Sequence, residues 1–421
     1  MARTVFADAS LVLPEGVVRG ALVVEDGRIA RIVEAGADGD VTVDTDEPLG
    51  AGRRGPADRG RPGPESDRGR EGRADAARVE HLDGDFLLPG LVEPHTDNVE
   101  RHLLPRPSAR WPNALAALLA HDAEIAASGI TTVCDSLRVG SHEGEREPRG
   151  ELFAAVAETL ARHAEALRVE HRLHIRCELT DPRLPETLEP FVDDPRVALL
   201  SLMDHTPGQR QWRDIEALRR HKSAPGGTRD AASIEREIAE RLEAGQRHVV
   251  AVRARVLERV AARVAARSLV LASHDDTTVE HVEQAAAEGI SIAEFPCTIE
   301  AARAASAHGL ATLGGAPNLV RGGSHSGNVA VRDLARAGVL DGLSSDYVPA
   351  STLQAVFALV AEEGWTLADA VALASAAPAD MLGLADRGRL RAGLRADLVR
   401  VALVGDTPRV RAVHVGGRRV A

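Results

Sequence analysis

Short apolar segments alternate with stretches rich in Ala and Leu along most of the chain. The apolar segments end in polar residues, and the intervening stretches, such as 112–128 and 152–167, have the length and composition of helices. Alternating strands and helices are typical of parallel β/α units. We count eight strands: Leu88–His95, Ile130–Asp135, Leu173–Glu178, Val197–Met203, Leu269–Ser273, Ile290–Phe295, Leu310–Leu313 and Leu343–Asp346. The pattern predicts an α/β fold, a (β/α)8 TIM-like barrel over residues 81–384.

Both ends of the chain have β character instead. Near the N-terminus, Ala21–Val24 and Arg28–Val33 flank the turn signal Glu25-Asp26-Gly27, and Arg409–Val415 is strand-like near the C-terminus. Strands on both sides of a barrel in sequence indicate that the two ends meet. We therefore expect residues 1–44 and 385–421 to form one small β-sandwich domain.

Two segments fit neither pattern. Residues 45–80 are dominated by Gly, Pro, Arg, Asp and Glu, and such a segment buries too little apolar surface to offset its ordering entropy. We expect a flexible or disordered insertion, because interleaved acidic residues argue against a basic nucleic-acid arm. The pattern of residues 229–267 predicts one or two amphipathic helices before the fifth strand. These helices could cover the active site or form an oligomer contact.

Composition limits the partners. The formal net charge is -12, with 27% charged and 44% hydrophobic residues, so the surface as a whole would recruit neither nucleic acid nor an anionic membrane. A polyanionic small-molecule substrate would then need a local basic pocket or a metal. The three cysteines lie in or beside apolar segments, as buried reduced thiols do, and no apolar run reaches the ~20 residues of a membrane span. We expect a cytoplasmic protein and leave a homo-oligomer open.

Candidate metal ligands stand at the ends of the predicted strands. His95 and Asp97 point to the same side of the first strand because side chains alternate. A His or carboxylate also closes three later strands, and in one barrel these ends converge. Imidazole and carboxylate ligands suit a divalent metal, most readily zinc, with manganese or iron as alternatives. The predicted ligands of one or two ions are His95, Asp97, Glu178, His205 and His274. The plainer alternative for Glu178 is an ion pair with Arg176, and for a lone His a structural role.

A second group of residues suits an anionic ligand. Glycines at 322, 323 and 327 allow close approach of the backbone, and neighbouring side chains offer donors to phosphate oxygens. The predicted substrate-binding residues are Gly322, Gly323, Ser324 and Asn328, with Arg101, His102 and Arg106 adding charge at the rim; the alternative for the last three is solvated loop charge. Asp346, at the end of the eighth strand, is a candidate general base or a helix N-cap.

These motifs resemble the amidohydrolase superfamily over nearly the whole chain. Residues 93–97, Glu-Pro-His-Thr-Asp, look like its first-strand metal motif, and residues 377–399 are similar to its closing signature. Two departures stand out: Asp97 occupies the place of a second His, and no lysine stands at a strand end to bridge two metals. The resemblance implies that Glu178 could take the bridging role, so one or two ions remain possible.

Longer motifs narrow the resemblance. Residues 95–98, 105–107, 201–209, 273–276, 294–296 and 315–328 together look like the α-D-ribose 1-methylphosphonate 5-triphosphate diphosphatase family of the carbon–phosphorus lyase pathway. That family removes pyrophosphate from a ribosyl triphosphate. The resemblance implies metal-assisted hydrolysis with Asp346 as the base and with Arg321 and His325 stabilising the departing pyrophosphate. The alternatives are a deacylase or deaminase that cuts a C–N bond, and a non-catalytic binding protein on a decayed barrel.

Overall fold

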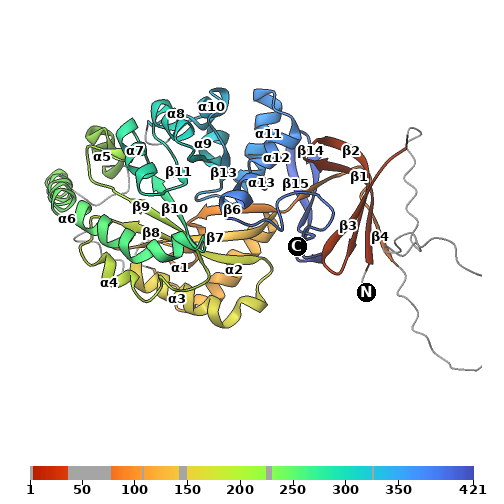
Figure 1. Ribbon diagram of the computed structural model, residues 1–421, viewed down its shortest axis with the longest axis horizontal. Coiled ribbons are helices and arrows are strands. Elements are labelled where there is room, and N and C mark those ends of the chain that lie inside the picture. Colours follow the sequence, from red (N-terminus) through yellow and green to blue (C-terminus); the bar gives the residue numbers. More distant parts are fainter. Residues whose placement is uncertain (1–2, 37–76, 107–108, 142–148, 224–229, 325–326) are drawn as a thin grey trace, which may run out of the picture.

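Eight parallel strands form the central barrel of the computed structural model, which describes residues 3–36, 77–106, 109–141, 149–223, 230–324 and 327–421 (Figure 1). They pair in chain order and are β6 (Leu91–Thr96), β7 (Ile130–Val139), β8 (Glu170–Glu178), β9 (Val197–Met203), β10 (Val270–His274), β11 (Ile292–Glu294), β12 (Ala311–Gly315) and β13 (Gly342–Ser344). The predicted barrel and its eight strands are confirmed. Its first strand begins at Leu91 rather than Leu88, because the preceding residues pair in another sheet.

The barrel closes between its last and first strands. Thr96 and Asp346 form a parallel bridge, the Asp346 amide donates to the His95 carbonyl (3.2 Å), and the Asp97 amide donates to the Asp346 carbonyl (3.0 Å). Asp346 takes a positive φ of 51° at this point. The seam therefore holds Asp346 in register with His95 and Asp97.

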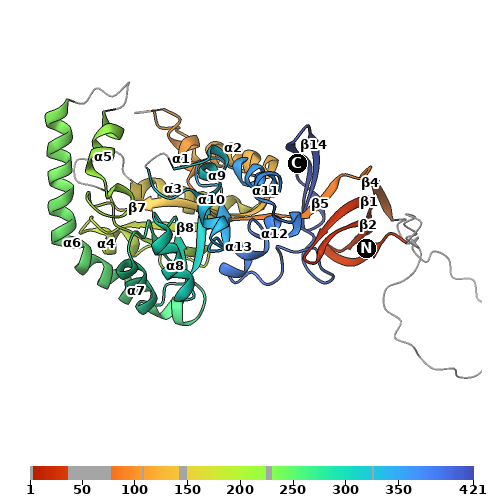
Figure 2. The ribbon, with the colours of Figure 1, turned by 90° about the horizontal axis from the view of Figure 1, so that it is seen from above.

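Helices surround the barrel (Figure 2). Several begin at the polar caps that such sequences favour: the side chains of Asn113, Thr278 and Thr298 each accept a hydrogen bond from the amide three residues later. The helices are α1 (Asn98–Leu103), α2 (Ala114–Ala127), α3 (Arg149–His163), α4 (Leu184–Leu188), α5 (Ile215–Lys222), α6 (Ala231–Ala265), α7 (Val279–Ala287), α8 (Ile299–Ala307), α9 (Ala316–Arg321), α10 (Val331–Arg336), α11 (Ser351–Glu363), α12 (Leu367–Ala372) and α13 (Ala376–Met381), with short 3₁₀ turns at Ala164–Ala166 and Arg210–Trp212.

The inserted helical segment is one continuous helix, α6. Its C-terminal half packs Val252, Val256 and Val260 into the barrel's helical layer, whereas Ile234 and Ile238 near its start pack with Trp212 in a separate small cluster. Figure 2 places α6 at the end of the molecule opposite the terminal sheet. No described helix is both long and apolar enough to cross a membrane.

Strands from both chain ends form a second, separate sheet, where Figure 1 also shows both termini. The pairings join β1 (Arg3–Leu13), β2 (Gly16–Glu25), β3 (Arg28–Glu34), β4 (Arg78–His81), β5 (Phe86–Pro89), β14 (Leu398–Val404), β15 (Thr407–Val415) and β16 (Arg418–Arg419). The expected meeting of the two ends is confirmed. The last residues of the segment expected to be flexible are instead strand β4, which pairs with β1; residues 45–76 of that segment lie outside the described residues.

Candidate active site

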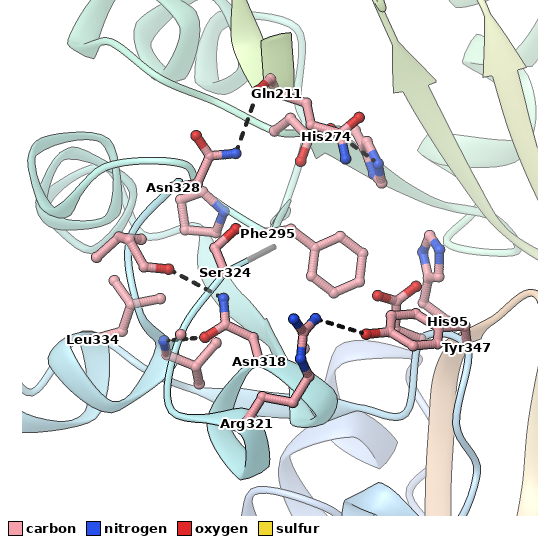
Figure 3. A pocket seen from close by; sticks show the side chains of 18 of the residues that line it. His95, Gln211, His274, Phe295, Asn318, Arg321, Ser324, Asn328, Leu334 and Tyr347 are labelled. Atoms are coloured by element: carbon pink, nitrogen blue, oxygen red, sulfur yellow. Dashed lines mark hydrogen bonds and ion pairs between the residues drawn. The ribbon is translucent and has the colours of Figure 1, made fainter. Parts of the chain in front are cut away.

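One pocket of about 260 Å³ opens where the barrel strands end (Figure 3). His95, His205 and His274 line it together with three carboxylates, those of Asp97, Asp275 and Asp346. Arg176 comes from β8, and α9 with the loop after it contributes Asn318, Arg321, Gly323, Ser324 and Asn328. The polar strand ends predicted from sequence therefore converge as parallel barrel strands require.

Each of the three imidazoles is anchored through its Nδ1 atom by a buried carboxylate. Glu294, at the end of β11, contacts His95 Nδ1 at 3.0 Å with one oxygen and His274 Nδ1 at 3.2 Å with the other. Glu178, at the end of β8, contacts His205 Nδ1 at 2.6 Å. The rings of His95 and His274 lie nearly parallel, with centroids 5.7 Å apart.

This arrangement fits a metal ion. A carboxylate beside Nδ1 favours the tautomer with the proton there, and Nε2 is then the coordinating nitrogen, as in many metal sites. One potential ligand atom from each of His205, His274 and Asp275 lies within 4.8 Å of the others, and His95 lines the same pocket. Imidazole with carboxylate suits zinc, manganese or iron.

Burial sets the charge of these groups. It lowers the pKa of His95 to about 4, although Glu294 opposes the shift, so this ring is neutral as a ligand must be. For Glu294, burial would raise the pKa, but its contacts with His95, His174 and His274, which include hydrogen bonds from the His95 and His274 rings, hold it well below its usual range. Burial also raises the pKa of Asp346 to about 7, and neighbouring Asp97 adds to the shift.

Two predicted ligands stand apart from the imidazoles' coordinating side. Glu178 lies behind His205, and its second oxygen accepts a hydrogen bond from Thr180 Oγ1 at 2.8 Å. Asp97 reaches the pocket, but its carboxylate faces Arg176 Nη1 at 3.4 Å. The geometry therefore favours Glu178 as an anchor of a ligand rather than a bridge, and it pairs Asp97 with an arginine.

His174, which the sequence did not single out, forms a potential metal group with His95 and Glu294. Its Nδ1 donates to the Pro94 carbonyl at 3.1 Å, and its Nε2 contacts Ser201 Oγ. Ser201 in turn donates to Glu294 at 2.6 Å. The one hydroxyl proton of Ser201 goes to Glu294, so Nε2 of the neutral His174 ring receives no proton from it, and His174 remains a potential ligand beside His95.

The anion-binding residues predicted from the glycine-rich segment are largely brought together. Arg321 is exposed at the pocket rim, where its Nη1 donates to the Tyr347 hydroxyl at 3.5 Å (Figure 3). Ser324 and Asn328 line the same wall, and the Asn328 amide donates to the Gln211 carbonyl at 3.5 Å. Gly322 ends α9 with a φ of 78°, which favours glycine. His325 lies outside the described residues.

The basic residues predicted beside the first strand, Arg101, His102 and Arg106, are not part of the pocket lining. Arg101 donates to the Asn98 side chain and the Tyr347 carbonyl, both at 3.2 Å. His102 contacts Glu124 at 2.9 Å, and Arg106 is exposed at an isolated bridge with Ala109. Arg106 fits the alternative weighed from the sequence, solvated loop charge, whereas the contacts of Arg101 and His102 favour structural roles.

A second buried group of potential metal ligands lies between α2, β7 and β8: His121, Asp135 and His171. The orientation of the Asn98 side chain decides whether this group is a metal site or a hydrogen-bonded network. The Asn98 side chain accepts from Arg101 and donates to Glu124 (2.9 Å), so its NH2 group also faces His121 Nδ1 at 3.1 Å. Nδ1 must accept, and Nε2 therefore carries the proton that it donates to Asp135 at 2.7 Å. We interpret the group as a hydrogen-bonded network.

Stability should depend on pH through His171 in this network. Burial would lower its pKa, but Asp135 and Asp122, at 2.8 and 3.3 Å, raise it to about 9. A raised folded-state pKa stabilises the protein fully below about pH 6.5, and this contribution disappears as pH rises through about 9. We expect the free energy of unfolding to fall by roughly 3 kcal/mol over that interval.

Denaturant unfolding at pH 6.5 and 9.5 measures this effect. The His171→Gln variant, whose side chain carries no titratable proton, should show a flatter dependence than the unaltered protein. Equal slopes for the two proteins would exclude His171 as the source.

Comparison with known proteins agrees with the fold. The model described as "Amidohydrolase family" matches residues 86–420. The alpha-D-ribose 1-methylphosphonate 5-triphosphate diphosphatase of Escherichia coli (strain K12) is 46% identical over 322 residues, which cover 75% of this chain and 83% of that protein.

Solved structures share the architecture at low sequence identity. The N-acetylglucosamine-6-phosphate deacetylase from Pasteurella multocida superposes with a TM-score of 0.56 at 13% identity, covering 99% of both chains. The 5-methylcytosine deaminase from Klebsiella pneumoniae, liganded with 5-fluorocytosine, gives a TM-score of 0.59 at 13% identity, covering 99% of this chain and 97% of the other. At these identities the likeness concerns the fold alone.

Proposed function

The chain belongs to the amidohydrolase family, and on this premise we propose that it hydrolyses α-D-ribose 1-methylphosphonate 5-triphosphate to 5-phospho-α-D-ribose 1-methylphosphonate and pyrophosphate in phosphonate catabolism. The diphosphatase that is 46% identical supports this substrate. The observation that carries the proposal is one pocket lined by both anchored imidazoles and two arginines. That combination suits hydrolysis of a polyanion.

The residues divide the chemistry between them. A divalent metal, which we propose to be zinc, would be held by His95, His205 and His274, and when bound it lowers the pKa of water and offsets phosphate charge. Asp346 accepts the proton of the water that attacks the α-phosphorus. Arg321 donates to oxygens of the departing pyrophosphate, where negative charge builds up.

The site supports further parts of the proposal. Asp275 lines the pocket and would complete the coordination, while Glu178 and Glu294 hold the imidazoles in orientation. Ser324 and Asn328 offer polar contacts to the substrate, and we include His325 with them because of its place in the same segment. We also propose a cytoplasmic enzyme that binds neither nucleic acid nor membrane.

Product analysis tests the reaction. The metal-loaded protein should release pyrophosphate, and no orthophosphate, from α-D-ribose 1-methylphosphonate 5-triphosphate, and chelation should abolish the release. Orthophosphate as the first product would place cleavage at another bond. Absence of any product with zinc, manganese or iron would contradict the proposal.

Hydrolysis of a C–N bond is the second candidate, because structures with this fold include a deacetylase and a deaminase. A neutral amide gives Arg176 and Arg321 no anion to bind, which disfavours this reaction. A panel of N-acetyl sugars and cyclic amidines should therefore give no product at enzyme concentrations that cleave the triphosphate.

A further inference from the structure

Arg176 lines the pocket and has few partners of its own. It stands on β8 two residues before Glu178, and its side chain is only 17% exposed. Its Nη1 faces the Asp97 carboxylate at the long distance of 3.4 Å, and its Nε atom is buried without a hydrogen-bond partner among the described residues. A guanidinium has five N–H donors, so most of them are uncommitted.

A largely buried guanidinium with unpaired N–H donors destabilises the folded protein unless a ligand accepts hydrogen bonds from it. Buried polar donors are almost always hydrogen-bonded in native proteins, and an unpaired one loses its hydration without compensation. By contrast, the buried guanidinium of Arg253 donates from Nε and Nη2 to Glu288. Arg176 differs from the other arginines with a partnerless Nε in lining the pocket, where a ligand can reach its donors.

The charges around the pocket identify the class of this partner. Asp97, Asp275 and Asp346 make the wall acidic, so a polyanion needs cationic side chains as well as metal. Arg176 and Arg321 are the arginines that line the pocket within the described residues, which contribute no lysine there. Arg321 is exposed at the rim, whereas Arg176 lies deep enough for its charge to act on Asp346 and His95.

We propose that Arg176 binds the substrate, donating to oxygens of the phosphate that is attacked, while Arg321 contacts the outer phosphates. This inference rests on the proposed function and adds a residue to it. Asp97 then holds the guanidinium in place between turnovers. Two arginines at different depths would place the polyphosphate along the pocket, with its reacting phosphorus beside Asp346.

The Arg176→Met variant tests the role, with Arg172→Met as the matched control. Arg172 lies on the same strand, pairs with Glu170 and does not line the pocket. We expect Arg176→Met to lose about 100-fold or more in kcat/KM, as when a transition-state donor is removed. Its metal content and melting temperature should match those of the control. Arg176→Lys, which keeps the charge and guards against misfolding, should recover part of the loss.

Binding of inorganic tripolyphosphate, measured by calorimetry on the zinc-loaded proteins, separates this inference from the proposed function. Arg176→Met should bind about tenfold or more weakly than Arg172→Met, whether or not the ribosyl triphosphate is hydrolysed. Equal tripolyphosphate affinity in the two variants, or loss of metal with Arg176→Met, would overturn the role of Arg176. Failure of the unaltered protein to cleave the ribosyl substrate would overturn the proposed function instead.

Discussion

Substituting Asp346 by Asn is expected to lower kcat for the ribosyl triphosphate by about 10²–10⁴-fold, the usual contribution of a general base. The amide keeps the shape of the side chain but cannot accept a proton. The backbone of residue 346 closes the barrel at His95 and Asp97, and this contact does not depend on the side chain. Metal content should therefore stay near that of the unaltered protein.

The pH dependence of kcat/KM adds a second readout for Asp346. A base works only when deprotonated, so the rate should fall as pH drops through its pKa, which burial and Asp97 raise to about 7. The Asn variant should lack this acid limb. Asp380→Asn, at an exposed carboxylate that pairs with Arg389, serves as the control. Turnover within threefold of the control would remove Asp346 as the base.

Replacing His274 by Ala is expected to remove both metal and activity. The imidazole belongs to the group formed with His205 and Asp275, and Ala offers no ligand atom. Glu294→Gln should have a graded effect, about 10–100-fold in metal affinity or activity, because its amide nitrogen cannot accept from an Nδ1–H group. Metal analysis and turnover check both variants, with the exposed His163→Ala as the control.

The order of effects in this series distinguishes a ligand from its anchor. His274→Ala should lose more metal than Glu294→Gln, and His163→Ala should lose none. A His274→Ala protein that retains full metal content would exclude His274 as a ligand.

The fold could be predicted because its signal is local. Each barrel strand is an apolar run ending in polar residues, and strand ends in a barrel converge, which is how His205 and His274 were placed with His95. The meeting of the two chain ends followed from β character on both sides of the barrel. Strand β4 was missed because Arg78–His81 is short, has Val79 as its one apolar residue, and continues the polar composition of the segment before it.

The partners of these residues could not be predicted, because contacts between distant segments leave no local pattern. Glu294 lies 199 positions after His95 and anchors its ring. The sequence showed Glu294 only as part of a longer motif, and it offered Arg176 only as an alternative ion-pair partner for Glu178. Side-chain alternation along β8 does place Arg176 and Glu178 on the same face of the strand. Only the pairing of neighbouring strands, however, shows that Glu178 contacts His205.

Hydrolysis in H₂¹⁸O tests the central claim, that water attacks the α-phosphorus in this pocket, most directly. After a single turnover of α-D-ribose 1-methylphosphonate 5-triphosphate by the metal-loaded protein, the account predicts ¹⁸O in the 5-phosphate of the ribosyl product and none in pyrophosphate. Label in pyrophosphate would mean attack on the β-phosphorus and would contradict the account.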